Sequence, residues 1–286
     1  MYIMDKDLKL QDWEFSQRKY LPYEIKLRLS ARRIMDWYDF YAGDVYLSFS
    51  GGLDSTVLGH MIAQVLGRKI PWVFVDTGLE LPEIREFVHS FDIEVLYPEC
   101  SFRDVILERG YPLISKEVAA KIRKLRHGNL SDRYRNYLLY GDERGKLGKL
   151  SECWNTSEEC CLIMKEKPLT SYAKATGRMP FIGITQDEGM MRQRQYNRTG
   201  CNVYNAKHPK SQPLGFWTKQ DILRYVVENN LRICPAYGSV VEKDGVYHTT
   251  GEKRTGCTFC AMGCHLEPTP NRYHRLREHD LKKYQY

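Results

Sequence analysis

A glycine-rich turn lies near residue 50, in the segment Ser48-Phe49-Ser50-Gly51-Gly52-Leu53-Asp54-Ser55. It follows the short β-prone run Val45–Phe49 and precedes apolar residues at helical spacing. Glycines permit a tight turn that brings backbone N–H groups close to a ligand. A following helix directs its positive end at the same place. We therefore expect phosphate groups to bind at this turn, with Ser50 and Ser55 adding hydroxyl donors.

Asp54 is an unusual residue for a loop that only holds an anion. A carboxylate fits there if Mg²⁺ lies between it and the phosphates, because Mg²⁺ commonly binds one or two carboxylates together with phosphate oxygens. The alternative is a strand–turn–helix junction in which Asp54 and Ser55 merely cap the helix. A second acidic turn, Asp76-Thr77-Gly78, also follows an apolar run. Its presence favours the binding interpretation.

Cysteines form the second group of residues suited to chemistry. Two are adjacent, and three more lie within eight residues of one another near the C-terminus. Adjacent cysteines usually point apart, which suits a [4Fe–4S] cluster that takes them through different irons. The ligands expected for such a cluster are Cys160, Cys161, Cys257 and Cys260. Two alternatives remain open: buried thiols without metal, or zinc bound by Cys257, Cys260, Cys264 and His265.

These residues need a scaffold, and the sequence predicts alternating strands and helices. The expected strands are Val45–Phe49, Trp72–Val75, Ile93–Tyr97 and Phe181–Ile184. The expected helices are Pro22–Phe40, Ser55–Leu66, Pro82–Phe91 and Lys219–Asn229. Such alternation predicts an α/β fold with a doubly wound parallel sheet. Ligands of this fold bind at the carboxyl ends of the strands, where both special turns are expected.

The predicted organisation has three parts. Residues 1–40 form an N-terminal helical segment, and residues 41–233 form the nucleotide-binding α/β domain. Residues 234–286 are irregular and rich in Gly, Pro, His and Cys. We expect this Cys-rich C-terminal segment to close the iron–sulfur site together with Cys160 and Cys161.

Composition excludes some classes of protein. The 286 residues are 42% hydrophobic and 28% charged, which is typical of a globular protein. No apolar run approaches the roughly 20 residues that cross a bilayer, and the N-terminus lacks a signal-peptide pattern. We therefore expect a cytoplasmic protein without a membrane partner. The net charge of +7 is concentrated in Lys116–Lys149, where ten basic residues face four acidic ones. This stretch is either a nucleic-acid-binding surface or a solvated helical face.

The turn SGGLDS resembles the PP-loop of ATP pyrophosphatases, which bind ATP and release pyrophosphate on attack at the α-phosphate. Val73–Glu83 and Pro213–Ile222 resemble elements of the PAPS/APS reductase (sulfonucleotide reductase) branch of that superfamily. The resemblance extends from about Pro22 to Tyr273 and implies an adenine nucleotide α-hydrolase-like fold. It implies that the nucleotide-binding residues are Ser48, Ser50, Gly51, Gly52, Leu53, Asp54, Ser55, Asp76, Thr77 and Gly78.

The same resemblance implies further functional residues. Gly183–Arg194 corresponds to an arginine-bearing loop that contacts phosphate or sulfate, and its arginines are Arg192 and Arg194. The catalytic residues implied are then Asp54, Ser55, Arg192 and Arg194. The Cys160-Cys161 pair with the later C-x-x-C is similar to the iron–sulfur motif of bacterial APS reductases.

Two departures from the reductases affect the reaction that we expect. Reductases carry a modified phosphate loop, whereas the loop here is intact, as in ATP sulfurylase small subunits and DndC-like proteins of DNA phosphorothioation. Reductases also carry a cysteine in a C-terminal Glu-Cys-Gly-x-His element, and here only Cys264-His265 offers a substitute. We therefore predict an ATP- and Mg²⁺-dependent adenylating enzyme that acts in sulfur transfer or nucleic-acid thiolation with a sulfur donor.

Two other functions remain open. One is thiol-dependent reduction of APS or PAPS to release sulfite, with Cys264 or a thiol-reductant protein. The other is a non-catalytic nucleotide- or nucleic-acid-binding regulator.

Overall fold

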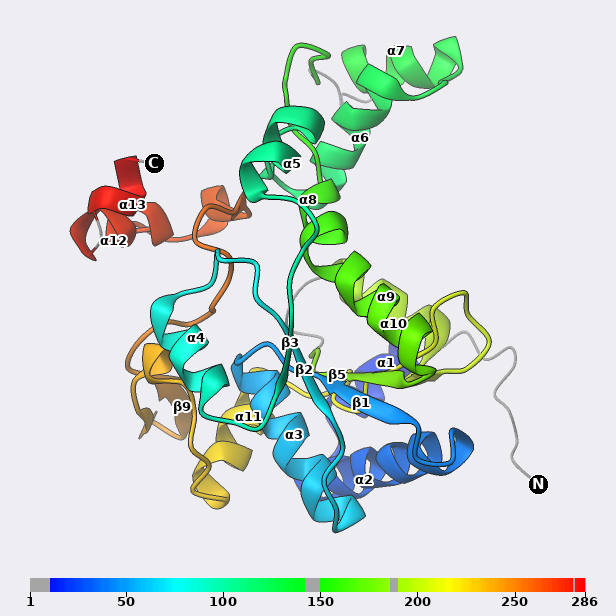
Figure 1. Cartoon of the computed structure of the whole chain (residues 1–286), viewed down its shortest axis with the longest axis vertical. Helices are drawn as coiled ribbons and strands as arrows, with labels where there is room; N and C mark the ends of the chain where they lie inside the picture. Colours follow the sequence, from blue (N-terminus) through cyan, green and yellow to red (C-terminus); the bar gives the residue numbers. More distant parts are fainter. Residues whose placement is uncertain (1–10, 142–149, 186–189, 280, 286) are drawn as a thin grey trace. The chain divides into compact units, whose positions relative to one another are not determined.

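The computed structural model describes residues 11–141, 150–185, 190–279 and 281–285. The chain forms two compact units, each made of two separate segments (Figure 1). Unit 1 consists of Met1–Tyr97 and Leu169–Gly256, and unit 2 of Pro98–Pro168 and Cys257–Tyr286. The division expected from the sequence, at residues 40 and 233, follows chain order and stays a prediction.

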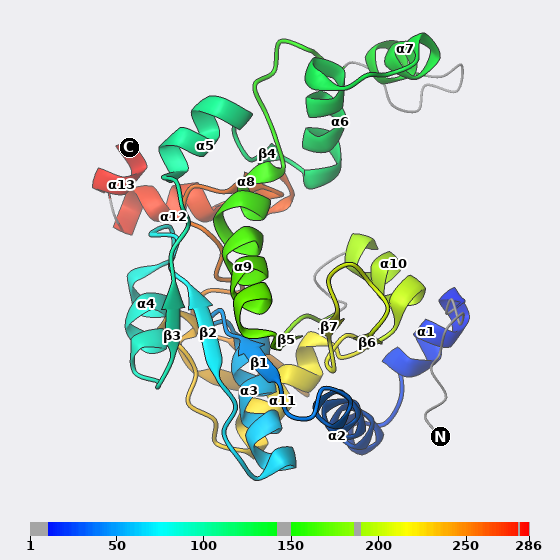
Figure 2. The same ribbon diagram turned by 45° about the vertical axis from the view of Figure 1, so that its right-hand side comes forward.

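A six-stranded sheet in the order β3-β2-β1-β5-β7-β6 forms the centre of unit 1 (Figure 2). All neighbouring strands are parallel except β6 and β7, so the predicted mostly parallel α/β sheet is confirmed. The strands are β1 Val45–Ser48, β2 Trp72–Val75, β3 Glu94–Leu96, β5 Met179–Ile182, β6 Asn202–Val203 and β7 Lys210–Ser211.

Side chains of β1 alternate between two apolar cores. Val45 and Leu47 are buried in the larger core with residues of several helices, whereas Tyr46 packs with Val73 and Tyr172 in a smaller one. Such alternation follows from the two-residue repeat of a strand, and it means that both faces of the sheet are covered. The helices that contribute buried residues to the larger core are α1 Asp12–Lys19, α2 Tyr23–Phe40, α3 Leu53–Leu66, α4 Pro82–His89, α10 Met190–Thr199 and α11 Lys219–Glu228. Tyr172 belongs to α9, Lys167–Thr176.

Predicted and observed elements of unit 1 differ mainly at their ends. Helix α3 begins at Leu53, two residues before the expected start at Ser55, so Asp54 lies in its first turn. Strand β5 ends at Ile182 instead of Ile184. The backbone of Gly183 lies against that of Ser55, since a Cβ at Gly183 would be only 2.6 Å from the Ser55 Cα. The chain after β5 is therefore in contact with the start of α3.

The Pro213–Ile222 element holds α2 against α11. Buried Lys26 pairs with Asp221 at 2.6 Å, and Asp221 also accepts the backbone N–H of Thr218 at 2.7 Å, capping α11. Trp217 Nε1 donates to Ser30 Oγ, which donates to the Pro213 carbonyl, both at 2.9 Å. These contacts assign the element a structural role.

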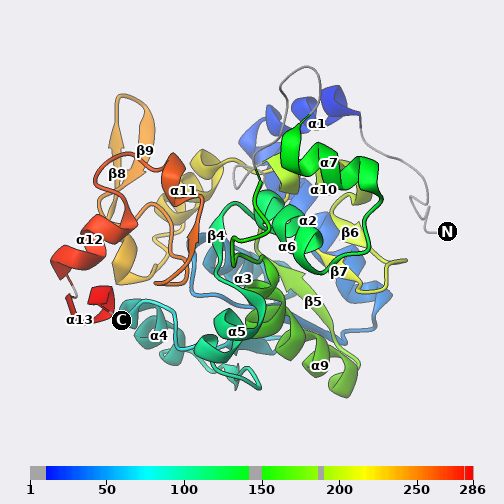
Figure 3. The same ribbon diagram turned by 90° about the horizontal axis from the view of Figure 1, so that it is seen from above.

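A hairpin of β8 (Val240–Lys243) and β9 (Val246–Thr249) lies beside α11 (Figure 3). The preceding 3-10 turn, Pro235–Tyr237, is joined to the returning chain. Gly251 N–H donates to the Tyr237 carbonyl at 2.9 Å, and Glu252 N–H donates to that of Ala236 at 2.8 Å. Helix α1, Asp12–Lys19, lies within residues 1–40, which were expected to be helical, whereas helix α10, Met190–Thr199, was not predicted from the sequence.

Unit 2 is mostly helical, with one short parallel pair of strands. Its helices are α5 Phe102–Arg109, α6 Lys116–His127, α7 Asp132–Tyr140, α8 Glu159–Cys161, the π-helix Leu162–Glu166, the 3-10 turn Cys264–Leu266, α12 Arg272–His279 and α13 Leu281–Gln285. The paired strands are β4 Leu113–Ile114 and β10 Ala261–Met262. The Cys-rich region around β10 is irregular, as expected. Among the described residues, none of the helices has the length and apolarity to span a membrane.

Candidate functional site

The glycine-rich turn connects the central strand β1 to helix α3. Gly51 has φ +70°, a left-handed conformation that glycine adopts without steric cost. A Cβ at Gly51 would lie 2.9 Å from Val88 and 3.1 Å from Ile84, both on α4. Gly52 is extended and directly precedes the first helical residue. The sequence prediction of a strand–turn–helix here is thus confirmed in its backbone.

Backbone N–H groups of this turn are weakly engaged. The N–H groups of Ser50, Gly52 and Leu53 each donate to a side-chain hydroxyl at 3.3 Å, which is long for a hydrogen bond. Within the described residues, the N–H groups of Gly51 and Ser55 have no acceptor. Unpaired N–H groups at the positive end of a helix form an anion site. The turn thus has the donors that a polyphosphate requires.

Side chains of the turn form a connected set of hydroxyl and carboxylate groups. Ser50 Oγ and Ser55 Oγ lie 3.0 Å apart, and Ser55 Oγ also donates to the Gly52 carbonyl at 3.0 Å. Asp54 Oδ2 accepts the hydroxyl of buried Thr185 at 3.2 Å. Thr185 follows β5 and was not predicted from the sequence. It holds the carboxylate that we expect to bind Mg²⁺.

The second acidic turn lies at the carboxyl end of β2, but its carboxylate serves the protein itself. Asp76 is 3% exposed and accepts Arg85 Nη2 at 2.8 Å and the Gly78 N–H at 2.9 Å. Thr77 Oγ1 donates to Glu80 at 2.8 Å. Asp76 therefore shapes the turn, and a contact with nucleotide by Asp76, Thr77 or Gly78 stays a prediction.

The remaining predicted site residues have fewer described side-chain contacts with the turn. Ser48 is half-buried at the end of β1, and Leu53 is buried, with its backbone N–H facing the turn. Arg194 is exposed on α10. The side chain of Arg192 lies outside the described residues, so a phosphate contact by either arginine stays a prediction.

Two hydroxyls that the sequence did not single out border the turn. Tyr237 Oη accepts the Leu53 N–H at 3.3 Å and lies 2.6 Å from Thr255 Oγ1. A Cβ at Gly52 would be 3.4 Å from Tyr237 Oη and 3.8 Å from Thr255 Oγ1. Nearly two hundred residues separate them from the turn, so local spacing gave no signal of this contact.

All five clustered cysteines belong to unit 2. Cys160 and Cys161 end α8, which continues into the π-helix Leu162–Glu166. π-helical turns are rare and occur frequently at functional sites. Cys257 and Cys260 form a tight turn, in which the Cys260 N–H donates to the Cys257 carbonyl at 3.1 Å.

Electrostatics link the four predicted cluster ligands. Burial is the largest cause that raises the pKa of the Cys160 thiol to about 12, followed by the neighbouring Cys161, Cys257 and Cys260. Cys160 is thus within electrostatic reach of the other three thiols. Among the described residues, no three His, Cys, Asp or Glu side chains are grouped to hold a single metal ion. This holds for the four predicted cluster ligands as well as for the zinc ligands, so the iron–sulfur cluster and the zinc alternative both stay predictions.

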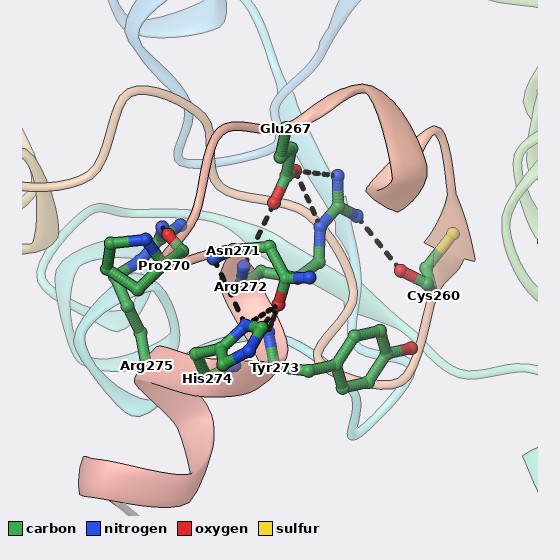
Figure 4. A network of polar contacts seen from close by, with 8 residues as sticks. All are labelled: Cys260, Glu267, Pro270, Asn271, Arg272, Tyr273, His274 and Arg275. Carbon is green, nitrogen blue, oxygen red and sulfur yellow. Dashed lines mark hydrogen bonds and ion pairs between the residues drawn. The ribbon is translucent and has the colours of Figure 1, made fainter.

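A polar network supports the second pair of cysteines (Figure 4). Arg272, the first residue of α12, donates from Nη1 to the Cys260 carbonyl at 2.9 Å and from Nε to Glu267 Oε1 at 2.8 Å. Its backbone N–H donates to Glu267 Oε2 at 2.9 Å. The Asn271 side chain accepts the Tyr273 N–H at 3.0 Å at the start of this helix. The network fixes the backbone of the C-x-x-C turn.

The basic stretch Lys116–Lys149 is partly used inside unit 2. Residues 142–149, with three of its basic side chains, lie outside the described residues. Four others have partners: Lys121 with Glu117, Arg123 with Glu158, Arg126 with Asn155 and Arg135 with Glu152. A nucleic-acid contact through this stretch stays a prediction.

Fold and turn together define an α/β protein with a glycine-rich loop of the phosphate-binding kind at its central strand. The chain belongs to a particular family within this class. The family model described as phosphoadenosine phosphosulfate reductase domain matches residues 44–99 and 130–268, which is most of the chain. The family consists of nucleotide-binding proteins of sulfur metabolism, as the resemblance indicated.

Relatives of similar length carry the name adenosine 5'-phosphosulfate reductase. The chain is 23% identical to the one from Anoxybacillus flavithermus over 263 residues, which cover 90% of this chain and 89% of that protein. It is 26% identical to the one from Oceanobacillus iheyensis over 236 residues, covering 80% and 77%.

Two solved structures are similar at 13–14% identity. One is phosphoadenylyl-sulfate reductase from Candida auris, with a TM-score of 0.43 and coverage of 83% of this chain and 98% of that chain. The other is the U34-tRNA thiolase NcsA from Methanococcus maripaludis with its [4Fe–4S] cluster, with a TM-score of 0.42 and coverage of 92% and 76%.

Proposed function

We propose that this protein binds ATP with Mg²⁺ at the Ser50–Ser55 turn and transfers adenylate to an acceptor, releasing pyrophosphate. The observation that supports this most directly is the turn itself. It combines unpaired N–H groups at the start of α3 with two serine hydroxyls and the Asp54 carboxylate. Phosphate oxygens fit the donors, and Mg²⁺ fits a carboxylate beside them.

The reaction balances without a redox step. An acceptor oxygen attacks the α-phosphorus of ATP and forms a new P–O bond. The bond to the β-phosphate breaks, and the acceptor's proton passes to solvent. Negative charge grows on the leaving pyrophosphate, and the unpaired Gly51 and Ser55 N–H groups would stabilise it. Thr185 holds Asp54 in place for the metal.

We further propose that Cys160, Cys161, Cys257 and Cys260 hold a [4Fe–4S] cluster. The four side chains supply only thiols, and thiolates are the usual ligands of iron–sulfur clusters. Bound there, a cluster supplies a site for sulfur or a structural cross-link between the two segments of unit 2. Arg272 fixes the turn that carries Cys257 and Cys260.

A second function has support from the relatives. The full-length similarity to proteins named adenosine 5'-phosphosulfate reductase favours thiol-dependent reduction of APS or PAPS. Two thiols would supply the two electrons: the first, Cys264 or a partner protein's, would bond to the sulfur of APS or PAPS and displace AMP or its 3'-phosphorylated form. A second thiol, from a reductant protein, would then displace sulfite from that sulfur and leave a disulfide.

Three assays on the whole protein distinguish these functions. We expect pyrophosphate release from ATP and Mg²⁺ when sulfate, single-stranded RNA or duplex DNA is offered as acceptor with sulfide as sulfur donor. Sulfite release from APS or PAPS with dithiothreitol, lost in Cys264→Ser, would instead establish the reductase. Binding of ATP without turnover in any assay would establish a non-catalytic regulator.

Asp54→Asn tests the metal role. The substitution keeps the size of the side chain and its contact with Thr185 but removes the charge that binds Mg²⁺. We expect pyrophosphate release to fall by about 100-fold or more, as for loss of one charge-stabilising group. Asp44→Asn, at an exposed position at the opposite end of β1, should leave the rate unchanged. Equal rates in wild-type and Asp54→Asn protein would rule out the metal role.

A further inference from the structure

Tyr237 and Thr255 place two hydroxyls, linked to each other by a hydrogen bond, beside the phosphate turn. We propose that Thr255 is a phosphate-binding residue and that Tyr237 is the positioning residue that aims its hydroxyl proton at the ligand. This proposal rests on the proposed nucleotide site. It adds to that site two residues from the last part of the second segment of unit 1, Leu169–Gly256. The ligand is a phosphate group of an adenine nucleotide.

Tyr237 and Thr255 lie next to the start of helix α3. Tyr237 Oη accepts the N–H of Leu53, the first residue of α3, at 3.3 Å. Thr255 Oγ1 lies 2.6 Å from that phenol oxygen. Both oxygens are within 4 Å of the point where a Cβ at Gly52 would lie. The pair therefore faces the side of Gly52 that has no side chain, where a ligand has access to the turn.

The hydroxyl protons of Tyr237 and Thr255 each need an acceptor. A hydroxyl has one proton to donate. The Tyr237 oxygen already accepts the Leu53 N–H, and a buried phenol needs an acceptor for its own proton. Thr255 Oγ1 is the one side-chain acceptor for it in the described chain. The 2.6 Å contact allows either hydroxyl to donate, and the need of the buried phenol for an acceptor assigns the donor role to Tyr237, which leaves the Thr255 proton for the ligand.

Burial and neighbouring contacts hold the Tyr237 side chain in place. Tyr237 is 4% exposed, and burial raises the pKa of its phenol, so it keeps its proton at neutral pH. The hairpin stem fixes its backbone through the Gly251 N–H bond at 2.9 Å. Lys219 Nζ lies 5.7 Å from the centre of its ring. A positioning residue needs such constraints on its rotamer.

The chemical consequence is a chain of donors that begins at the positive end of α3. The Leu53 N–H donates to Tyr237, Tyr237 donates to Thr255, and Thr255 donates to the ligand. Hydrogen bonds in series polarise one another, so the last proton favours an anionic acceptor. Arg254, exposed next to Thr255 in the sequence, adds positive charge. Phosphate oxygens fit this terminus, whereas a neutral ribose or base does not use its polarity.

The test measures binding of an ATP analogue with a methylene bridge between its phosphates, by titration calorimetry on the full chain. We expect Thr255→Val to weaken binding about tenfold, as loss of a hydrogen bond to a charged group does. Thr255→Ser, which retains the hydroxyl, should bind within about twofold of wild type. Adenosine, which has no phosphate, should bind all variants equally. Ser239→Ala, which removes an exposed hydroxyl just before β8, is the control and should match wild type.

Tyr237→Phe tests the direction of the chain of donors. Removing the phenol oxygen leaves Thr255 without its donor, so binding should weaken several-fold. The double variant Tyr237→Phe/Thr255→Val should bind no more weakly than Thr255→Val alone, because both changes remove one pathway. Additive losses would overturn the positioning role of Tyr237.

If Tyr237→Phe does not fold, the affinities of Thr255→Val and Thr255→Ser for the ATP analogue still test the proposal. Thr255→Val that binds within about twofold of wild type would overturn the proposal, as would Thr255→Ser that binds as weakly as Thr255→Val. Failure of the proposed function looks different, because the wild-type protein itself would then not bind the ATP analogue.

Discussion

At the scale of single residues, the two glycines of the turn have different reasons to be glycine. Gly51 has a left-handed backbone, which costs other residues roughly 1–2 kcal/mol, and α4 blocks the space for its Cβ. Gly52 has an ordinary extended conformation. The space that its missing side chain leaves is bordered by Ser50, Tyr237 and Thr255. Gly51 thus serves the fold, whereas Gly52 is free of this constraint and has the role in ligand binding that we propose.

Gly52→Ala follows from this difference. The added methyl would lie 3.2 Å from Ser50 Oγ and 3.4 Å from Tyr237 Oη, in the space that faces the ligand. We expect the ATP analogue to bind at least about tenfold more weakly, with the thermal unfolding midpoint nearly unchanged. Gly51→Ala should instead lower that midpoint. Scanning calorimetry and titration calorimetry on both variants check the pair, and a Gly52→Ala protein with wild-type affinity would contradict the assignment.

The sequence predicted the contiguous residues of the site and missed those that come from elsewhere. Gly51, Gly52 and Ser55 are recognisable because one short strand–turn–helix segment carries them all. Thr185 and Tyr237 approach that segment only because β5 and the hairpin stem return to it in the folded chain. Long-range contacts of this kind leave no periodic signal in a single sequence.

At the scale of elements, the buried pair Lys26–Asp221 connects α2 to α11. The side chains are 3% and 13% exposed, so the charges are largely removed from water. Asp221 also caps α11 through Thr218. Strongly amphipathic helices such as these two were predicted correctly, whereas short strands such as β6 and β7 were not, because two residues are too few to show a repeat.

Lys26→Met should destabilise unit 1 by about 3–5 kcal/mol, the usual cost of leaving one member of a buried ion pair without its partner. Urea unfolding followed by tryptophan fluorescence measures the change, since Trp37 and Trp217 are buried in the same core. Arg28→Met, at an exposed position on the same helix, should change stability by less than about 0.5 kcal/mol. Equal stability of the two variants would contradict the structural role of the pair.

At the scale of the whole molecule, the proposed nucleotide site and the proposed iron–sulfur cluster belong to different units of the chain. The phosphate turn and three residues that border it, Thr185, Tyr237 and Thr255, belong to unit 1, and the cysteines of the proposed cluster belong to unit 2. Each unit depends on two chain segments. The second segment of unit 2 is held by few regular hydrogen bonds, among them those of β10 with β4.

Removal of iron should therefore make unit 2 more susceptible to proteases and leave nucleotide binding by unit 1 nearly unchanged. Protein purified without oxygen should contain iron and sulfide in equal amounts, near four of each per chain for a cube-type cluster. After chelation, we expect proteases to cleave Pro98–Pro168 and the region after Cys257 faster, because metal binding that stabilises a fold is lost with the metal. Affinity for the ATP analogue should change little. Protein with zinc and no iron, or with an unaltered cleavage pattern, would oppose the cluster assignment.

Gly183 imposes a restriction on how this protein can change over evolution. A Cβ there would meet main-chain atoms of Asp54 and Ser55, at 2.8 and 2.7 Å, rather than side-chain atoms. Main-chain atoms are the same in all residues, so no replacement at position 54 or 55 makes room. A mutant at Gly183 therefore has no compensating second mutation at these two neighbours, and lineages that keep the turn can only keep the glycine.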